Sequence, residues 1–90
     1  MPTATITVVT APACPLCADA QAALAELGRD VPVRVDLVAA DSDAGQALVG
    51  AHRPAMFPLV LVDGAFFSTG RLPRRKLHAL LAARPAGIRP

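Results

Sequence analysis

The chain has 90 residues, enough for one hydrophobic core and too few for a second, so we expect a single domain over residues 1–90. Apolar residues make up 53% of the sequence and only three residues are aromatic, which excludes a disordered chain and predicts an aliphatic core around Phe57, Phe66 and Phe67. The net charge of +2 is unevenly distributed, because residues 1–69 carry −4 and residues 70–90 carry +6.

The sequence shows no membrane or export signal. No apolar run approaches the ~18 residues of a transmembrane helix. The first basic residue is Arg29, so the N-terminus lacks the basic stretch that opens a secretory signal. We therefore expect a cytoplasmic, reducing environment and no membrane partner.

The first two predicted elements flank the only two cysteines. Residues 5–10 are rich in β-branched side chains, which favours a strand, and residues 18–27 are rich in alanine and leucine and precede Gly28, which favours a helix. The motif Cys14-Pro15-Leu16-Cys17 lies between them, and Pro15 suits the first helical position because no N–H is needed there. Cys14 is therefore predicted at the helix N-terminus.

The two cysteines are expected to differ in exposure. A helical wheel gathers one apolar arc from Leu16, Ala20, Ala23, Leu24 and Leu27. Cys17 lies at the edge of this arc and Cys14 lies further round, so we expect Cys17 to be sheltered and Cys14 to be exposed. Unpaired N–H groups and the helix dipole stabilise a thiolate at the position of Cys14. An accessible thiolate backed by a second thiol is the arrangement that dithiol-disulfide exchange requires.

Two other interpretations of the cysteine pair stay open. A C-x-x-C pair can supply part of a zinc or iron-sulfur site, completed across a dimer or by a small thiol, although the sequence has no second cysteine pair. The pair can also be two structural cysteines. In a reducing compartment, a position between a strand and a helix favours redox chemistry, with no bound metal or cofactor.

The middle of the chain predicts a strand and a short helix. Residues 31–37 alternate apolar and polar side chains, and Pro32 places this strand at a sheet edge because it cannot donate to a central ladder. The preceding helix favours parallel pairing with the first strand in a βαβ unit. Asp41-Ser42-Asp43 predicts the N-cap of a second helix, which ends at Gly50 and the Pro54 region. The apolar residues of this helix are Ala44, Ala47, Leu48 and Ala51.

The last third of the chain predicts a hairpin and a helix. Residues 59–62 are continuously apolar, as in a strand covered on both faces, and the Asp63-Gly64 turn predicts an antiparallel partner over residues 65–69. Pro73 opens the final helix, which Arg84-Pro85 ends, and residues 85–90 are expected to be a frayed tail. The inward side chains of this helix are predicted to be Leu77, Leu80 and Leu81.

This βαβαββα order, with the cysteine motif after the first strand and Phe57-Pro58 before the third, resembles a small glutaredoxin-like protein of the thioredoxin superfamily. The resemblance implies an α/β, thioredoxin-like fold with a four-stranded mixed sheet and helices on both faces. It also implies a cis bond before Pro58, which would lie against the disulfide and, with the backbone of Phe57, border the substrate. Pro54 is expected to be trans.

Several positions depart from the usual glutaredoxin pattern. A lysine before the first cysteine, an aromatic residue within the motif, Thr-Val before the cis proline and Gly-Gly with acidic residues before the last helix are all missing. The chain has in their places Thr10-Ala11-Pro12, Leu16, Met56-Phe57 and Ser68-Thr69-Gly70-Arg71. We therefore expect glutathione to be a weak ligand.

The sequence predicts a thiol-disulfide oxidoreductase in which Cys14 is the nucleophile and Cys17 the resolving thiol. Its substrate would be a disulfide-containing protein or a low-molecular-weight thiol compound, its electron donor is unidentified, and a monomer is expected. Arg53, in the loop before Pro58, is a candidate to stabilise a substrate carboxylate or the Cys14 thiolate. The predicted substrate-binding positions are Phe57, Pro58, Arg53, Thr69 and Gly70.

The C-terminal basic residues and the two histidines are expected to be solvated surface residues. A cluster of Arg71, Arg74, Arg75 and Lys76 could contact nucleic acid or another anionic partner. Without Tyr or Trp for stacking, a solvated helix face is favoured and no nucleic-acid partner is expected. His52 and His78 are expected on the surface.

Overall fold

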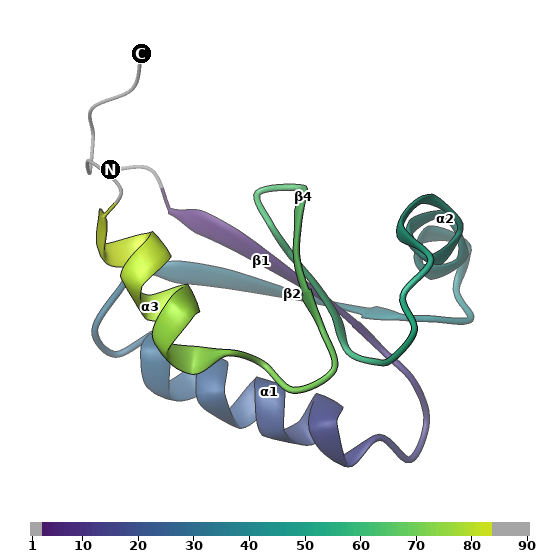
Figure 1. Ribbon diagram of the computed structural model, residues 1–90, viewed down its shortest axis with the longest axis horizontal. Coiled ribbons are helices and arrows are strands. Elements are labelled where there is room, and N and C mark those ends of the chain that lie inside the picture. The colour runs from purple at the N-terminus through teal and green to yellow at the C-terminus, as the bar shows by residue number, and fades with distance from the viewer. Residues whose placement is uncertain (1–2, 84–90) are drawn as a thin grey trace.

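The computed structural model describes residues 3–83, which form four strands and three helices (Figure 1). In chain order the elements are β1 (Ala4–Thr10), α1 (Pro15–Leu27), β2 (Val33–Ala39), α2 (Asp43–His52), β3 (Leu59–Val62), β4 (Ala65–Thr69) and α3 (Arg74–Ala83). The predicted order of elements is confirmed. The predicted helix end at Arg84-Pro85 and the tail over residues 85–90 lie outside the described residues.

The strands form one mixed sheet in the order β2-β1-β3-β4. β1 pairs in parallel with β2 and antiparallel with β3, and β4 returns antiparallel to β3. The edge position predicted for β2 is confirmed, and the strand begins directly after Pro32, which has no N–H to donate. Because β2 lies at the edge, Val35 and Leu37 stay 38% and 55% exposed.

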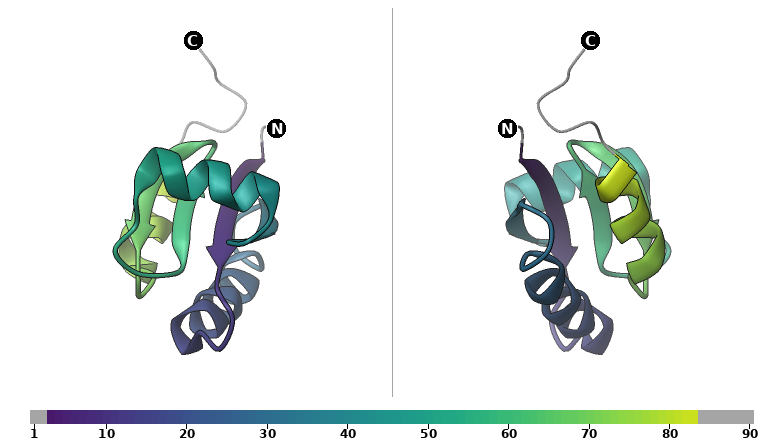
Figure 2. Two further views of the ribbon diagram at one scale, coloured as in Figure 1. Left: turned by 90° about the vertical axis from the view of Figure 1, so that its right-hand side faces the viewer. Right: turned by 90° about the vertical axis from the view of Figure 1, so that its left-hand side faces the viewer.

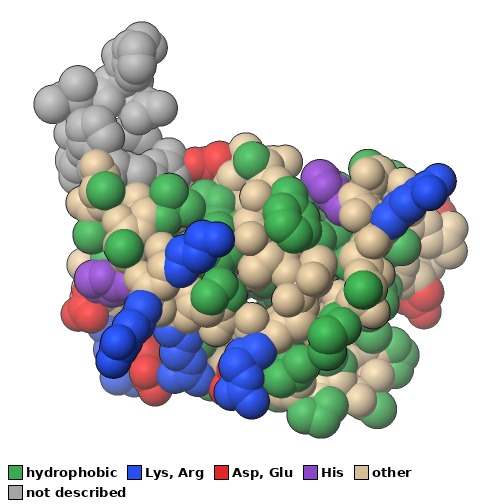
Figure 3. All heavy atoms as spheres, viewed as in Figure 1, with side chains coloured by type: hydrophobic (Ala, Val, Ile, Leu, Met, Phe, Trp, Pro, Cys, Tyr) green, Lys and Arg blue, Asp and Glu red, His purple; other side chains and the backbone are tan. Residues whose placement is uncertain are grey.

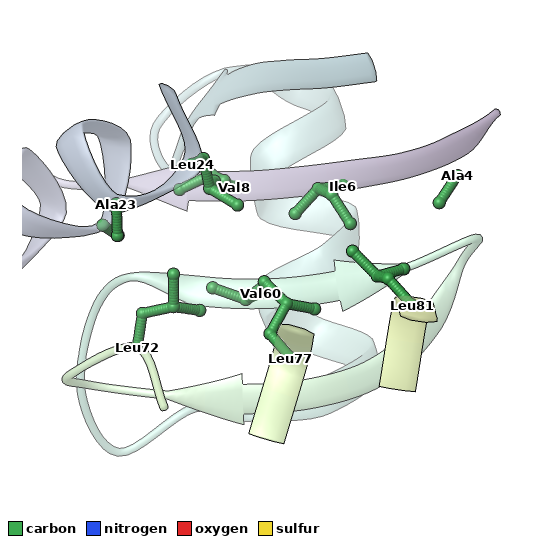
Figure 4. Close-up of a cluster of buried hydrophobic side chains, with 10 residues drawn as sticks. Ala4, Ile6, Val8, Ala23, Leu24, Val60, Leu72, Leu77 and Leu81 are labelled. Atoms are coloured by element: carbon green, nitrogen blue, oxygen red, sulfur yellow. The ribbon is translucent and has the colours of Figure 1, made fainter. Parts of the chain in front are cut away.

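The helices divide between the two sides of the sheet, with α1 and α3 on one side and α2 on the other (Figure 2). The α1/α3 side holds the larger cluster, in which Val8, Leu24 and Leu77 bring β1, α1 and α3 together (Figure 4). The α2 side holds a smaller cluster of Val9, Leu59 and Leu61. β3 is therefore covered on both faces, as its continuous apolar run predicts.

The core is aliphatic as predicted, but the phenylalanines do not form its centre. The hairpin turn at Asp63 and Gly64 has positive φ at both residues, and the β3–β4 pairing has a bulge between Val60 and Leu61, just before the turn. The bulge leaves Phe66 opposite Leu61 on the α2 side, where the ring centroid of His52, at the end of α2, lies 6.2 Å from the Phe66 ring centroid and Phe66 stays 55% exposed. Phe67 packs against the larger cluster instead, and the Lys76 ammonium lies 5.6 Å from its ring centroid.

The prediction for α2 is right at the start, and at the end it is right for the Pro54 region and wrong for Gly50. Ser42 is the N-cap, and its hydroxyl accepts a hydrogen bond from the Gly45 N–H at 3.0 Å. The helix continues through Gly50 and stops at Arg53, whose φ of 47° is left-handed. The inward face is formed by Gly45, Leu48 and Val49, because Gly45 is the residue that lies against the backbone after β2. The other apolar residues that the sequence places in this helix, Ala44, Ala47 and Ala51, are exposed.

The prediction for α3 is wrong at one leucine. Leu77 and Leu81 lie one turn apart and are buried at 1% and 5% exposure, whereas Leu80 is 43% exposed. Leu80 lies off the inward face and, together with Phe66 and Phe67, lines a pocket at the turn end of the hairpin. No helix within residues 3–83 has the length and apolar character needed to cross a membrane.

Candidate active site

Cys14 and Cys17 form a disulfide at the start of α1, with their Cα atoms 5.2 Å apart. Cys14 is the N-cap residue, and its extended backbone (φ −113°, ψ 98°) turns the chain from the loop into the helix. Its Sγ accepts a hydrogen bond from the Cys17 N–H at 3.1 Å. The sulfur therefore occupies the place where free N–H groups and the helix dipole favour negative charge.

Cys17 is sheltered as predicted, and Cys14 is the more exposed of the two, although it is half-buried and not fully exposed. Cys17 is 3% exposed, on the same helix face as the buried Ala20 and Leu24. Cys14 is half-buried and precedes exposed Pro15. Ala13, directly before the disulfide, has a left-handed φ of 51°, which costs a non-glycine residue about 1 kcal/mol. Of the two sulfurs, only that of Cys14 is on a residue that reaches the surface.

The strand pairing brings the loop before β3 to the disulfide end of the sheet. Val9 faces Leu59 in the β1–β3 register, so the next residue of β1 lies across from Pro58 as the chain turns toward Cys14. The bond between Phe57 and Pro58 is cis, as the resemblance implied, and the bond before Pro54 is trans. The Pro58 carbonyl accepts a hydrogen bond from the Gly70 N–H at 3.1 Å. The loops before α1, before β3 and after β4 therefore meet at one end of the sheet.

Met56 lies at this same end of the sheet, although the sequence around it predicts no role for it. Its side chain is 53% exposed, and a Cβ built on Gly70 would lie 3.4 Å from the Met56 sulfur. Gly70 has a left-handed φ of 75°, as a glycine tolerates. Because the contact joins residues that are far apart in the sequence, no local pattern could have revealed it. Met56 places a flexible apolar side chain beside Gly70.

The other predicted binding positions differ in their burial and in what they contact. Thr69 ends β4 opposite Leu59 and is half-buried. Phe57 is partly buried and packs against the smaller cluster on the α2 side. Arg53 is exposed at the end of α2, and its guanidinium makes no hydrogen bond or ion pair with any of residues 3–83. The structure thus brings Pro58, Thr69 and Gly70 together but shows no contact from Arg53 to Cys14.

No acidic side chain lies in the helix turn that holds the two cysteines. Asp19, one turn further on, accepts a hydrogen bond from Arg74 of α3 at 2.9 Å, so its carboxylate is paired. Within the described part of the chain, no three His, Cys, Asp or Glu side chains gather as a metal site would need.

Comparison with solved structures identifies the fold. An uncharacterised thioredoxin-like protein from Clostridium perfringens matches 90% of this chain and 70% of its own, with a TM-score of 0.73 and 14% identity. A thioredoxin-2 described as a component of the malaria parasite protein secretion machinery matches 91% and 84%, with a TM-score of 0.61 and 17% identity. A thioredoxin from Thermus thermophilus matches 89% and 72%, with a TM-score of 0.54 and 22% identity.

The chain has a thioredoxin-like fold. The four-stranded mixed sheet between α1 and α3 on one side and α2 on the other is the shared architecture. Identities of 14% to 22% establish a common fold and carry no activity or partner across. No protein-family model matches the sequence, and no curated protein matches it.

Proposed function

We propose that the protein is a glutaredoxin-like dithiol-disulfide oxidoreductase that reduces the disulfide of a protein or of a small thiol compound. One observation carries the proposal. The Cys14 sulfur sits at the N-cap of α1, bonded to the buried Cys17 and hydrogen-bonded to its N–H. This arrangement gives an accessible sulfur with a stabilised negative charge and a second sulfur within bonding reach.

In the first step, the reduced protein attacks through the Cys14 thiolate. The thiolate forms a bond to one sulfur of the substrate disulfide, the substrate S–S bond breaks, and the other substrate sulfur leaves as a thiolate that takes a proton from water. The product is a mixed disulfide between Cys14 and the substrate. We propose that this intermediate lies against the segment of Pro58, Thr69 and Gly70, with the backbone of Phe57 beside it.

In the second step, Cys17 releases the substrate. Its thiol gives its proton to water, and its thiolate attacks the Cys14 sulfur, so that the mixed disulfide breaks and the second substrate thiolate leaves. Two electrons have passed from the dithiol to the substrate, and the Cys14–Cys17 disulfide has formed. A thiol or dithiol donor then returns two electrons and restores the reduced pair.

A stoichiometric reaction tests the proposal. Reduced protein, freed of reductant, is mixed with a peptide that contains one disulfide, and free peptide thiols are counted. We expect each chain to reduce one peptide disulfide and to end with its own disulfide formed. Protein that is oxidised beforehand is the matched control and should be inert. Purified protein that holds a stoichiometric metal or cluster and leaves the peptide unreduced would instead support metal or cluster binding.

Glutathione is expected to be a poor partner. The motivation is the absence of the usual lysine before Cys14 and the Ser68-Thr69-Gly70-Arg71 stretch before α3. In a glutathione-coupled disulfide assay we expect a rate well below that of an ordinary glutaredoxin at the same enzyme concentration. Turnover equal to the ordinary enzyme would show that these positions do not govern glutathione use.

A further inference from the structure

The disulfide end of the sheet presents its loops in a row that follows the strand order. β1 and β2 are parallel and both end here, at Thr10 and Ala39, and the Ala40 N–H donates to the Thr10 carbonyl at 2.8 Å. β3 starts here and β4 ends here, since both run antiparallel to their neighbours. The row therefore runs from residues 40–43 beside β2, through residues 11–14 and 56–58, to residues 70–73 beside β4.

The two ends of this row carry opposite charge. Asp41 and Asp43 are exposed beside β2, whereas Arg71 is exposed beside β4. Arg71 directly follows Gly70, whose N–H donates to the Pro58 carbonyl, so it adjoins the proposed substrate-binding residues. Neither a hydrogen bond nor an ion pair joins the Arg71 side chain to any of residues 3–83.

The nearby carboxylates do not cancel the positive charge on the β4 side. α1 carries two carboxylates, Asp19 and Glu26, and both are paired with Arg74, at 2.9 Å and 3.9 Å. Arg75 and Lys76 are exposed in the first turn of α3. Arg75 lines a pocket with Glu26 and Asp30, so Arg71 and Lys76 carry the positive charge nearest β4. Figure 3 shows several separate blue side chains, with red ones among them, over the region of α3, and green side chains gathered over the start of α1.

Distance keeps the two charged ends separate. Neighbouring strands lie ~4.8 Å apart, so β2 and β4, with two strands between them, are separated by about 14 Å. The Debye length is about 8 Å at physiological salt. A charge on a bound substrate beside β4 therefore interacts mainly with Arg71 and only weakly with Asp41 and Asp43.

We infer that the protein prefers disulfides flanked by acidic residues and docks them with those residues over Arg71 and Lys76. The inference rests on the proposed function and names its substrate class. The apolar surface at Met56 contacts the substrate around its disulfide, and the basic residues beside β4 attract and orient its acidic side. Attraction of this kind raises the association rate and weakens as salt is added.

The test uses the full chain in its reduced form, freed of reductant. Three peptides contain the same single disulfide, flanked by two Glu, two Gln or two Lys residues. For each peptide, the rate constant for reduction by the protein is divided by the rate constant for reduction of the same peptide by dithiothreitol, which corrects for the intrinsic reactivity of its disulfide. At low ionic strength we expect the Glu peptide to react about tenfold faster than the Lys peptide, with the Gln peptide between them. At about 1 M salt, where the Debye length is ~3 Å, the three rate constants should converge.

Three variants locate the effect. Arg71→Gln should reduce the Glu-to-Lys rate ratio by about threefold or more. Arg29→Gln is the matched control, because it removes the same charge just beyond the far end of α1, a helix of 13 residues and so about 20 Å long. It should leave the ratio unchanged. Asp41→Asn should change the ratio in the opposite direction from Arg71→Gln and by less.

The outcomes separate the inference from the proposed function. Reduction of all three peptides at equal normalised rates overturns the inference and leaves the oxidoreductase intact. Equal loss of preference in Arg71→Gln and Arg29→Gln also overturns it, because net charge and not docking beside β4 would then be responsible. Failure to reduce any peptide removes the proposed function, and the inference with it.

Discussion

The two sides of the sheet are built differently. The α1/α3 side holds ten buried residues, among them Ile6, Leu24 and Leu77, whereas the α2 side holds three. On the first side, helices are kept in place by large aliphatic side chains. On the second side, α2 approaches so closely at Gly45 that an added Cβ would meet the carbonyl group of Ala39 and lie 2.9 Å from the Ala40 carbonyl carbon.

The cysteine pair is carried by the side of the sheet with the larger buried cluster. The cysteines are at the start of α1, the helix with the larger buried cluster, and Cys17 shares its face with Leu24. Side-chain packing therefore determines how the helix N-terminus is presented. α2 packs on a thinner layer and is positioned mainly by the approach of one backbone to another. We expect substitutions on the two sides to fail for different reasons.

The largest stability effect should come from the α1/α3 side. Leu24→Ala should lower the free energy of unfolding by about 2–5 kcal/mol, because it removes a fully buried side chain and leaves a cavity. Chemical denaturation of the oxidised protein measures the change. Leu80→Ala is the matched control and should cost under ~1 kcal/mol, since Leu80 is 43% exposed. Equal losses would mean that the described packing of α1 is wrong.

On the α2 side, adding one methyl group should destabilise the protein. Gly45→Ala should cost about 1–3 kcal/mol, because the new Cβ meets backbone atoms that cannot rotate away. The same denaturation experiment applies. A neutral result would show that α2 can shift off the sheet without loss.

The other glycine of the same helix should respond with the opposite sign. Gly50→Ala should raise the free energy of unfolding by roughly 0.5–1 kcal/mol, because nothing lies within 4 Å of the new Cβ and alanine favours the helix. Thermal unfolding, followed by circular dichroism, measures the gain. If Gly50→Ala destabilises as much as Gly45→Ala, close approach is not what distinguishes the two positions.

The smallest effect concerns the ion pair that links α1 to α3. Asp19→Asn should cost only about 0.2–1 kcal/mol, because the Asp19 and Arg74 side chains are 34% and 51% exposed and water screens them. High salt should reduce the difference between variant and parent. A loss above ~2 kcal/mol would place more of the α1–α3 contact in this pair than its exposure allows.

Local signals predicted most of the fold. The apolar run over residues 59–62, the Asp63-Gly64 turn and Pro32 each act within a few residues, so the order of elements, the hairpin and the edge position of β2 could be anticipated. The errors arose where contacts are distant. Phe66 is exposed because a bulge changes which side chains share a face, and the inward face of α2 depends on Gly45 meeting Ala39.

The same division applies to the site. The positions of Cys14 and Cys17 follow from one helix start, and that of Pro58 from a family resemblance. Pro58 and its neighbours lie on three separate loops, which are far apart in the sequence. The contact between Met56 and Gly70 and the exposed Arg71 beside them were therefore visible only in the folded chain.

The most direct test of the account is to trap the mixed disulfide. Reduced Cys17→Ser and Cys14→Ser proteins are each mixed with a disulfide-containing peptide, and the adducts are followed over time by intact-protein mass spectrometry. Cys17→Ser should accumulate a stable adduct through Cys14, because attack is possible and resolution is not. Cys14→Ser should form little or none, since its remaining thiol is buried at 3% exposure. Faster adduct formation by Cys14→Ser than by Cys17→Ser would contradict both the assigned roles of the two cysteines and the proposed mechanism.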